Sequence, residues 1–180
     1  MDDIARHLGI SKKTIYNFFP DKEKLVNLIM ARNIAKDKEA FKQISSSAPN
    51  IVEEFFQYMK HLSGMFSKIN PMVFYDLQKY HPETWKLFKE FKENFILKMV
   101  EDTLQKGISQ GLVRSEINTR VLSRLRIEQI EWGFNPEMFP PGQFSPFEVQ
   151  LSIMEHFLYG ICTLKGHKLI NKLKQITEEE

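Results

Sequence analysis

A short run of cationic, hydroxyl and amide side chains near the start of the sequence has the chemistry of duplex recognition. Lys12, Lys13, Thr14 and Asn17 lie within one stretch of six residues. Lysine donates hydrogen bonds to guanine acceptors, asparagine pairs with adenine, and the threonine methyl group contacts thymine. We therefore expect these four side chains to approach base edges, and Ser11, Tyr16 and Lys22 to hold phosphates beside them.

Two short helical patterns must position these groups. Apolar residues first recur at Ile4, Ala5 and Leu8, and a second pattern covers residues 14–19. Gly9 can adopt the left-handed conformation that ends one helix, and Ser11 is a good N-cap for the next. Two short helices joined at a glycine predict a helix-turn-helix, whose second helix enters the major groove.

The same residues resemble the DNA-binding motif of the TetR family of bacterial transcriptional regulators. The resemblance covers about the first seventh of the chain and is carried by Ile4-Ala5, Gly9, Ser11, Ile15-Tyr16, Phe19 and Lys22-Glu23-Lys24-Leu25. It implies phosphate contacts for Tyr16 and Lys22. It further implies a homodimer in which the last two long helices of each subunit form a four-helix bundle, and a small-molecule effector.

Members of that family carry one more helix before the motif, whereas this sequence begins directly on it. Ile4, Leu8, Ile15 and Phe18 are then expected to lack part of their cover, which is a liability for an isolated fold. Two explanations remain open. Either the recorded chain lacks an N-terminal stretch, which we favour, or the protein lacks the helix and its DNA-binding domain is impaired.

Composition favours a globular protein in a reducing compartment. Apolar residues make up 42% of the chain and include fifteen phenylalanines, which excludes a disordered protein. We expect no membrane association, since no apolar run approaches spanning length. The single cysteine, Cys162, and the lack of an apolar export signal indicate a cytoplasmic location. The net charge is only +2, but residues 1–44 carry nine Lys/Arg against six Asp/Glu, as phosphate attraction requires.

The periodicity predicts an all-α fold in two parts. Residues 1–44 would form an incomplete helix-turn-helix module with a connecting helix that starts near Asp21, and residues 50–180 a larger ligand-binding and dimerisation domain. The intervening Ser45–Pro49 segment is expected to be a linker. Further helices are expected over 51–69, from Asn70-Pro71 to His81, from Pro82 to about Gln110, from Asn118 or Thr119 to Trp132, and from Phe147 onward, where Gly166 is a possible break.

Two sets of apolar side chains compete for the larger domain's buried surface. The first set is expected to line an apolar or amphipathic ligand pocket and comprises Phe55, Met59, Phe66, Phe74, Tyr75, Trp85, Phe88, Phe91 and Phe95. The second set is expected to form the dimer interface and comprises Val121, Leu125, Phe147, Leu151, Met154, Leu158, Gly160 and Ile161. An ordinary core is the alternative for either set.

Catalytic constellations are not evident in the sequence. The five histidines show no metal-ligand spacing, and neither a phosphate-binding glycine loop nor a serine nucleophile motif occurs. Arg126, Glu128 and Glu131 are expected to form an exposed charged face rather than an active site. We therefore expect no enzyme activity, no metal and no cofactor.

Together these features predict a DNA-binding regulator, specifically a repressor that a small apolar or amphipathic ligand releases from a double-stranded operator. The alternative is a helical ligand-binding or protein-interaction dimer that has lost DNA binding.

Overall fold

The computed structural model describes residues 1–66, 70 and 72–176, without the side chains of Met65 and Phe66. The described residues form helices and connecting loops, which confirms the all-α prediction. The elements are α1 (Asp2–Leu8), α2 (Lys12–Phe18), α3 (Lys22–Ser47), α4 (Ile51–Phe66), α5 (Val73–Tyr80), α6 (Pro82–Phe91), η1 (Lys92–Ile96), α7 (Leu97–Ser109), α8 (Thr119–Trp132), α9 (Pro146–Ile161) and α10 (Leu164–Lys174).

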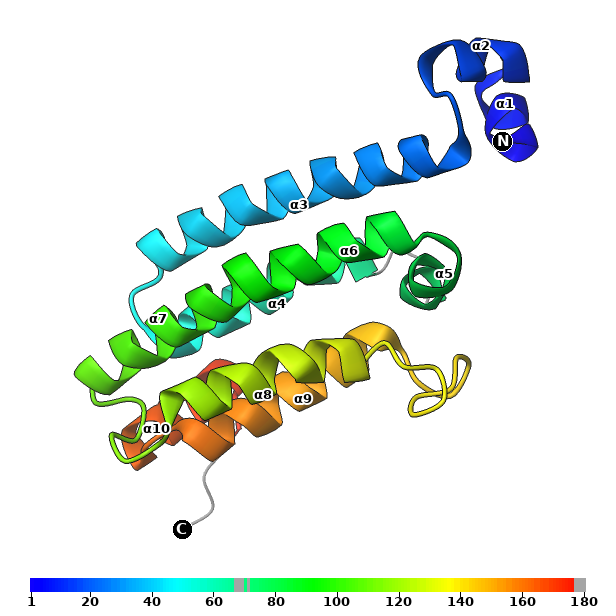
Figure 1. Ribbon diagram of the computed structural model, residues 1–180. Helices are drawn as coiled ribbons and strands as arrows, with labels where there is room; N and C mark the ends of the chain where they lie inside the picture. The colour runs from blue at the N-terminus through cyan, green and yellow to red at the C-terminus, as the bar shows by residue number, and fades with distance from the viewer. Residues whose placement is uncertain (67–69, 71, 177–180) are drawn as a thin grey trace.

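The helices stack in layers beneath a long connecting helix (Figure 1). Helix α3 runs over α6 and α4, α7 packs on α8, and α4 also contacts α9 and α10. The short helices α1 and α2 lie together beyond the N-terminal end of α3, away from the bundle (Figure 1). One continuous helix therefore connects the predicted DNA-contacting end to the bundle.

Side-chain caps set several helix starts, among them two where the sequence predicts them. The Oδ1 of Asp21 accepts a hydrogen bond from the backbone N–H of Lys24 at 2.7 Å, so α3 begins at Lys22. Asn118 caps α8 in the same way, through the backbone N–H of Val121 at 3.1 Å. Each cap satisfies an amide that has no partner within its own helix.

Two details of the predicted boundaries are wrong, and a third is not tested. The serines of the predicted linker continue α3 to Ser47, and the chain leaves the helix only at Ala48, before Pro49. The expected extension of α4 to Ile69 falls outside the described residues. After α9 the helix breaks at Cys162, and Thr163 caps α10, so Gly166 lies inside a helix. Gly166 fits there because a Cβ would lie 2.6 Å from the backbone oxygen of Leu112.

The predicted long helix after Pro82 is confirmed, with one irregular turn. Residues 92–96 form a π-helical turn, η1, between α6 and α7. Before this turn the helix buries Phe88 and Phe91, and after it Val100 and Leu104. Such turns are rare and mark sites where the regular hydrogen-bond pattern is interrupted, often for function.

One apolar core holds the bundle together. Its fully enclosed members come from α4, α7, α8, α9 and α10 and include Ile51, Leu104, Ile127, Leu158 and Ile170. Among the described residues, the helices are all too short or too polar to cross a membrane.

Candidate nucleic-acid interface and ligand pocket

The turn between α1 and α2 forms as the sequence predicts. Gly9 adopts φ 64°, and the backbone N–H of Ile10 reaches the carbonyl oxygen of Ala5 at 3.0 Å. The Oγ of Ser11 then accepts a hydrogen bond from the N–H of Thr14 at 3.1 Å and starts α2. Both caps are local, which explains why this corner of the molecule is readable from sequence.

Helix α2 keeps one apolar side chain inside and turns its polar ones outward. Ile15 is buried with Ala5 of α1, while Lys12, Lys13, Tyr16 and Asn17 are exposed. Lys12 also forms an ion pair with Asp2 at the start of α1.

The remaining three predicted DNA-contacting residues are Ser11 and Thr14, which take part in the cap of α2, and Lys22, which lies on α3. Thr14 is half-buried, and its Oγ1 lies 2.9 Å from the Oγ of Ser11, so both hydroxyls share the cap. Lys22 is exposed in the first turn of α3, close in sequence to α2. The structure thus gathers the seven predicted side chains at one end of the molecule.

Several apolar side chains of this module are also exposed. Phe18 is 77% exposed and Leu8 is 59% exposed, with Ile4 and Ile10 less so. The expected loss of cover is therefore present at Ile4, Leu8 and Phe18. It is absent at Ile15, which α1 covers well enough to leave it 4% exposed.

A polar contact ties the first turn of α3 to the bundle. The Oε2 of Glu23 lies 2.5 Å from the Nδ1 of His81, and its Oε1 accepts a hydrogen bond from the Oγ1 of Thr84 at 3.1 Å. His81 stands at the corner between α5 and α6, and Thr84 is fully buried. We call these three residues the corner contact. The hydrogen bond from His81 holds the pKa of the Glu23 carboxyl below its usual value.

The corner contact predicts a pH-dependent loss of stability in the variant Glu23→Gln. A carboxyl whose pKa is lower in the folded state stabilises the fold above its unfolded-state pKa, and the contribution disappears as pH falls through the folded pKa. We expect E23Q to melt below the parent protein at pH 7 and the difference to close on acidification below about pH 4.5. Thermal unfolding by circular dichroism between pH 3 and pH 7 measures it, and a difference independent of pH contradicts it.

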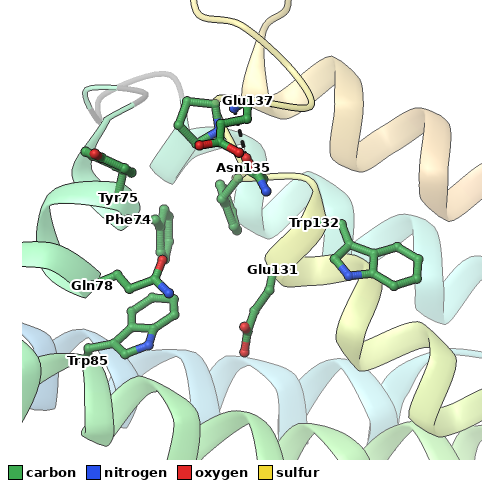
Figure 2. Close-up of a pocket in the computed structure, with 10 residues that line it drawn as sticks. Phe74, Tyr75, Gln78, Trp85, Glu131, Trp132, Asn135 and Glu137 are labelled. Atoms are coloured by element: carbon green, nitrogen blue, oxygen red, sulfur yellow. Dashed lines mark hydrogen bonds between the residues drawn. The ribbon is translucent and has the colours of Figure 1, made fainter.

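A cavity of about 270 Å³ opens between α5, α6 and the end of α8. Figure 2 shows Tyr75, Phe74 and Trp85 on one side of this cavity, with Glu131 and Trp132 on the other side. The cavity is lined by Phe74, Tyr75, Gln78, Trp85, Glu131, Trp132, Phe134, Asn135, Pro136 and Glu137. Sequence reasoning found three of these residues but missed the residues of α8 and of the loop behind it.

The other predicted pocket residues are distributed differently. Phe88 and Phe91 line a second, apolar cavity of about 250 Å³ between α3, α5 and α6, which Phe74 also borders. Phe95 borders a groove of about 210 Å³ beside α3. Phe55 and Met59 lie in the core, and the side chain of Phe66 lies outside the described residues. The structure therefore does not bring the nine residues into one chamber.

A buried ammonium group supports the carboxylate wall of the 270 Å³ cavity. Lys92 of η1 is 1% exposed and pairs with Glu131 and, at 3.3 Å, with Glu128. Arg124 pairs with Glu128 at 3.4 Å and with Glu93. This charged cluster crosses from η1 to α8 and fixes the direction of the Glu131 side chain.

The expected exposed charged face on α8 is wrong. Glu128 and Glu131 are half-buried in the Lys92 cluster, and Arg126 is only 5% exposed. Within the described part of the chain, the Nη1 of Arg126 has no hydrogen-bond partner, and burial lowers the pKa of its guanidinium to about 10.

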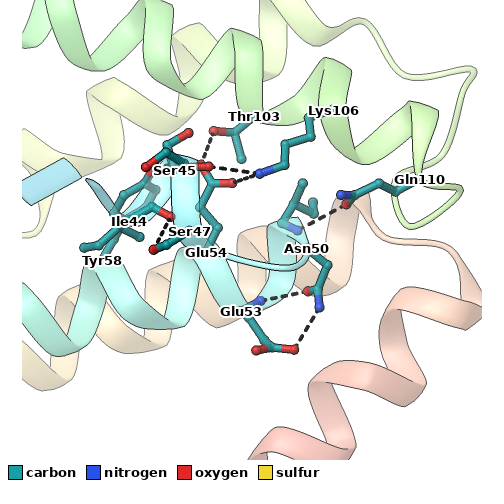
Figure 3. A network of polar contacts seen from close by, with 12 residues as sticks. Ile44, Ser45, Ser47, Asn50, Glu53, Glu54, Tyr58, Thr103, Lys106 and Gln110 are labelled. Atoms are coloured by element: carbon teal, nitrogen blue, oxygen red, sulfur yellow. Dashed lines mark hydrogen bonds and ion pairs between the residues drawn. The ribbon is translucent and has the colours of Figure 1, made fainter. Parts of the chain in front are cut away.

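A second buried carboxylate links three helices (Figure 3). The Oε1 of Glu54 accepts hydrogen bonds from the hydroxyls of Tyr58 at 2.7 Å and Thr103 at 3.0 Å. Its Oε2 accepts a hydrogen bond from the ammonium of Lys106 at 3.0 Å, and Lys106 also reaches the carbonyl of Ser45 at 3.1 Å. Glu54 is fully buried, so this network closes the bundle where α3 ends.

The predicted dimer residues divide between surface and core. Val121, Leu125 and Gly160 are exposed on α8 and α9, and a Cβ at Gly160 would meet nothing within 4 Å. Phe147 and Leu151 are half-buried, and the other three are core residues of a single protomer, namely Met154, Leu158 and Ile161.

Over the described residues, no three His, Cys, Asp or Glu side chains gather closely enough to hold a metal ion. Cys162 is buried, and burial raises the pKa of its thiol to about 11. A buried, protonated thiol is a poor nucleophile.

Comparison with known proteins agrees with the geometry of the N-terminal helices. Residues 1–29 match the family described as "Bacterial regulatory proteins, tetR family". The uncharacterized HTH-type transcriptional regulator YvaF of Bacillus subtilis (strain 168) is 28% identical over 163 residues, which cover 89% of this chain and 84% of that protein.

Solved structures extend the similarity to the bundle. A TetR family transcriptional regulator from Agrobacterium tumefaciens superposes with a TM-score of 0.69 at 17% identity, over 90% of this chain and 86% of that one. FadR of Thermus thermophilus, a TetR family repressor in complex with lauroyl-CoA, gives 0.56 at 17% identity, over 87% and 81%. The opening residues of this chain thus match the TetR family, and its fold is similar to that of TetR family transcriptional regulators.

Proposed function

We propose that the protein is a homodimeric repressor that a small ligand in the 270 Å³ cavity releases from its operator. One observation carries this proposal. The cavity takes its walls from α5 and α6, and the corner between these helices holds Glu23, which follows directly on the helix-turn-helix. A ligand that moves the corner therefore changes the direction of α3 and the spacing of two recognition helices.

Ligand control follows from unequal affinity for two conformations. A ligand that binds more tightly to the conformation with badly spaced recognition helices must lower the affinity for the operator. By the same linkage, bound operator lowers the affinity for the ligand by an equal factor. The ligand-bound FadR supports this scheme, because a protein of the same fold holds a small molecule. For the division of labour, we assign DNA contact and connection to residues 1–44 and ligand binding and dimerisation to residues 50–180.

Selection of bound sequences from random duplexes tests the DNA-binding half of the proposal. We expect an enriched site with two half-sites related by two-fold symmetry, since a symmetric dimer reads a symmetric operator. Binding to that site should weaken steeply with salt, because every phosphate contact releases counterions. Lys98→Ala, which removes an exposed lysine of α7, is the matched control and should leave the salt slope unchanged. Failure to enrich any sequence contradicts the proposal.

If the protein is a homodimer through α8, a charge introduced on the exposed apolar face of α8 should separate the protomers. Leu125 is 38% exposed on the same helix face as Val121, and Gly160 of α9 leaves space for a neighbouring helix. We expect Leu125→Glu to shift the protein from dimer to monomer in sedimentation velocity, because a carboxylate would be buried at the interface.

Leu164→Glu is the matched control, since Leu164 is 79% exposed at the start of α10. It should leave the dimer intact. Equal dissociation in both variants, or none in Leu125→Glu, removes α8 from the interface.

A further inference from the structure

The lining of the 270 Å³ cavity indicates what kind of ligand it takes. We infer that it binds a monovalent organic cation, a quaternary ammonium group attached to an apolar or aromatic body. This inference rests on the proposed function only in taking the cavity as the effector site. Its basis is the ring content, the charge and the size of the cavity.

Half of the residues that line the cavity are aromatic. The rings of Phe74 and Phe134 stack with centroids 3.8 Å apart, and Trp85 and Trp132 stand on opposite sides (Figure 2). Aromatic faces carry negative electrostatic potential and attract cations, most strongly in tryptophan. Tyr75 already shows this behaviour, since the ammonium of Lys79 lies 5.4 Å from the centroid of its ring. Lys79 itself is exposed and does not line the cavity.

The charges at the wall are negative. Among the described residues, the lining includes Glu131 and Glu137 but no lysine or arginine. Lys92 and Arg124 supply two positive charges behind the wall, against three carboxylates of Glu93, Glu128 and Glu131. Glu137 has no ion pair within the described part of the chain. An anion would be repelled here, whereas a cation supplies the charge that the cluster lacks.

Hydration distinguishes a quaternary ammonium group from a lysine-like one. Aromatic rings offer no strong hydrogen-bond acceptor to replace the water around a primary ammonium, whereas a quaternary group has no N–H to satisfy. Gln78 and Asn135 are the only uncharged amides in the lining, and the Oδ1 of Asn135 already accepts the N–H of Glu137 at 2.8 Å. Glu131 already binds Lys92, so a cation that lies against the rings gains most when it needs no hydrogen bond of its own, and Glu137 adds negative charge.

The chain reports on this cavity by its own fluorescence. It contains two tryptophans, and both of them, Trp85 and Trp132, line the cavity. We would titrate the full chain with benzyltrimethylammonium and, separately, with neopentylbenzene, which has the same shape without the charge. Saturable quenching by the cation and none by the neutral compound at equal concentration is the expected result. Equal responses, or no response to the cation, overturn the inference.

Three variants make the test specific. Glu131→Gln removes a wall charge and should weaken cation binding about tenfold. Trp85→Leu keeps the charged cluster and an apolar wall but removes one aromatic face. It should lower the affinity for the cation by about the same factor, and it serves as the test if E131Q folds poorly. Glu116→Gln, at an exposed site in the loop before α8, should change nothing. Unchanged affinity in Trp85→Leu, with a native circular dichroism spectrum, contradicts a role for the rings.

A further titration with decanoate and with DNA separates this inference from the proposed function. Cation binding without any loss of operator affinity defeats the proposed release mechanism and leaves the ligand class intact. Decanoate that binds and releases DNA, while the cation does neither, defeats the ligand class and leaves the release mechanism intact.

Discussion

Replacing Lys106 with methionine is expected to lower the free energy of unfolding by about 3–5 kcal/mol, because it leaves the fully buried Glu54 carboxylate without a cation. For a chain of this size the melting temperature should fall by roughly 10 °C. Tyr58 and Thr103 still donate hydrogen bonds to the carboxylate but do not supply a positive charge. Urea denaturation followed by circular dichroism measures the loss.

Two matched variants control this prediction. Lys98→Met removes an exposed lysine, whose pair with Asp102 is open to solvent, and should cost less than about 1 kcal/mol. The double variant Glu54→Gln/Lys106→Met removes both charges and should recover most of the stability, since an uncharged pair leaves no buried ion. A loss in Lys106→Met no larger than in Lys98→Met would show that Glu54 does not depend on its ion pair.

Two single substitutions in α2 should distinguish a phosphate contact, which positions the protein on DNA, from a base contact, which reads the sequence. Tyr16→Phe removes one hydroxyl from an exposed side chain, and we expect it to weaken binding to all sequences alike, as loss of a phosphate contact does. Lys13→Ala should instead change sequence preference at one base pair of each half-site, by about 1–3 kcal/mol in discrimination. Fluorescence anisotropy on the selected operator and on a scrambled duplex gives both quantities.

The measurement on Lys13→Ala can also contradict a base contact. Equal losses on the operator and the scrambled duplex would reduce Lys13 to a backbone contact. Lys42, exposed in α3 and remote in sequence from α2, is the control position, and Lys42→Ala should bind both duplexes as the parent protein does.

Local signals made the first module and the helix starts predictable. The caps at Ser11, Asp21 and Asn118 each join atoms three residues apart, so the sequence itself contains both partners. The same is true of Gly9, whose left-handed turn depends on its own residue type. Pairing across long separations was not predictable in this way. Glu23 meets a histidine 58 residues later, and no spacing rule connects them.

The burial of charged side chains was also not predicted: Arg126 was expected on an exposed face, and no role was predicted for Lys92. Lys92 and Arg126 are polar residue types, so a periodicity argument places them on the outside. Yet each lies on an apolar stripe, Lys92 four residues from Phe88 and Ile96, and Arg126 four residues from Leu122 and Ile130. A charge within such a stripe signals burial. Which partner satisfies it depends on the packing of separate helices, which the sequence does not encode locally.

The π-helical turn at residues 92–96 holds one residue more than a regular winding requires. Because each residue turns an α-helix by about 100°, moving that surplus residue along the chain rotates one half of the long helix against the other by the same angle. The turn carries Lys92, whose ammonium fastens the wall of the aromatic cavity. Because Lys92 belongs to this turn, a change in the register of the turn would also move the Glu131 wall of the cavity.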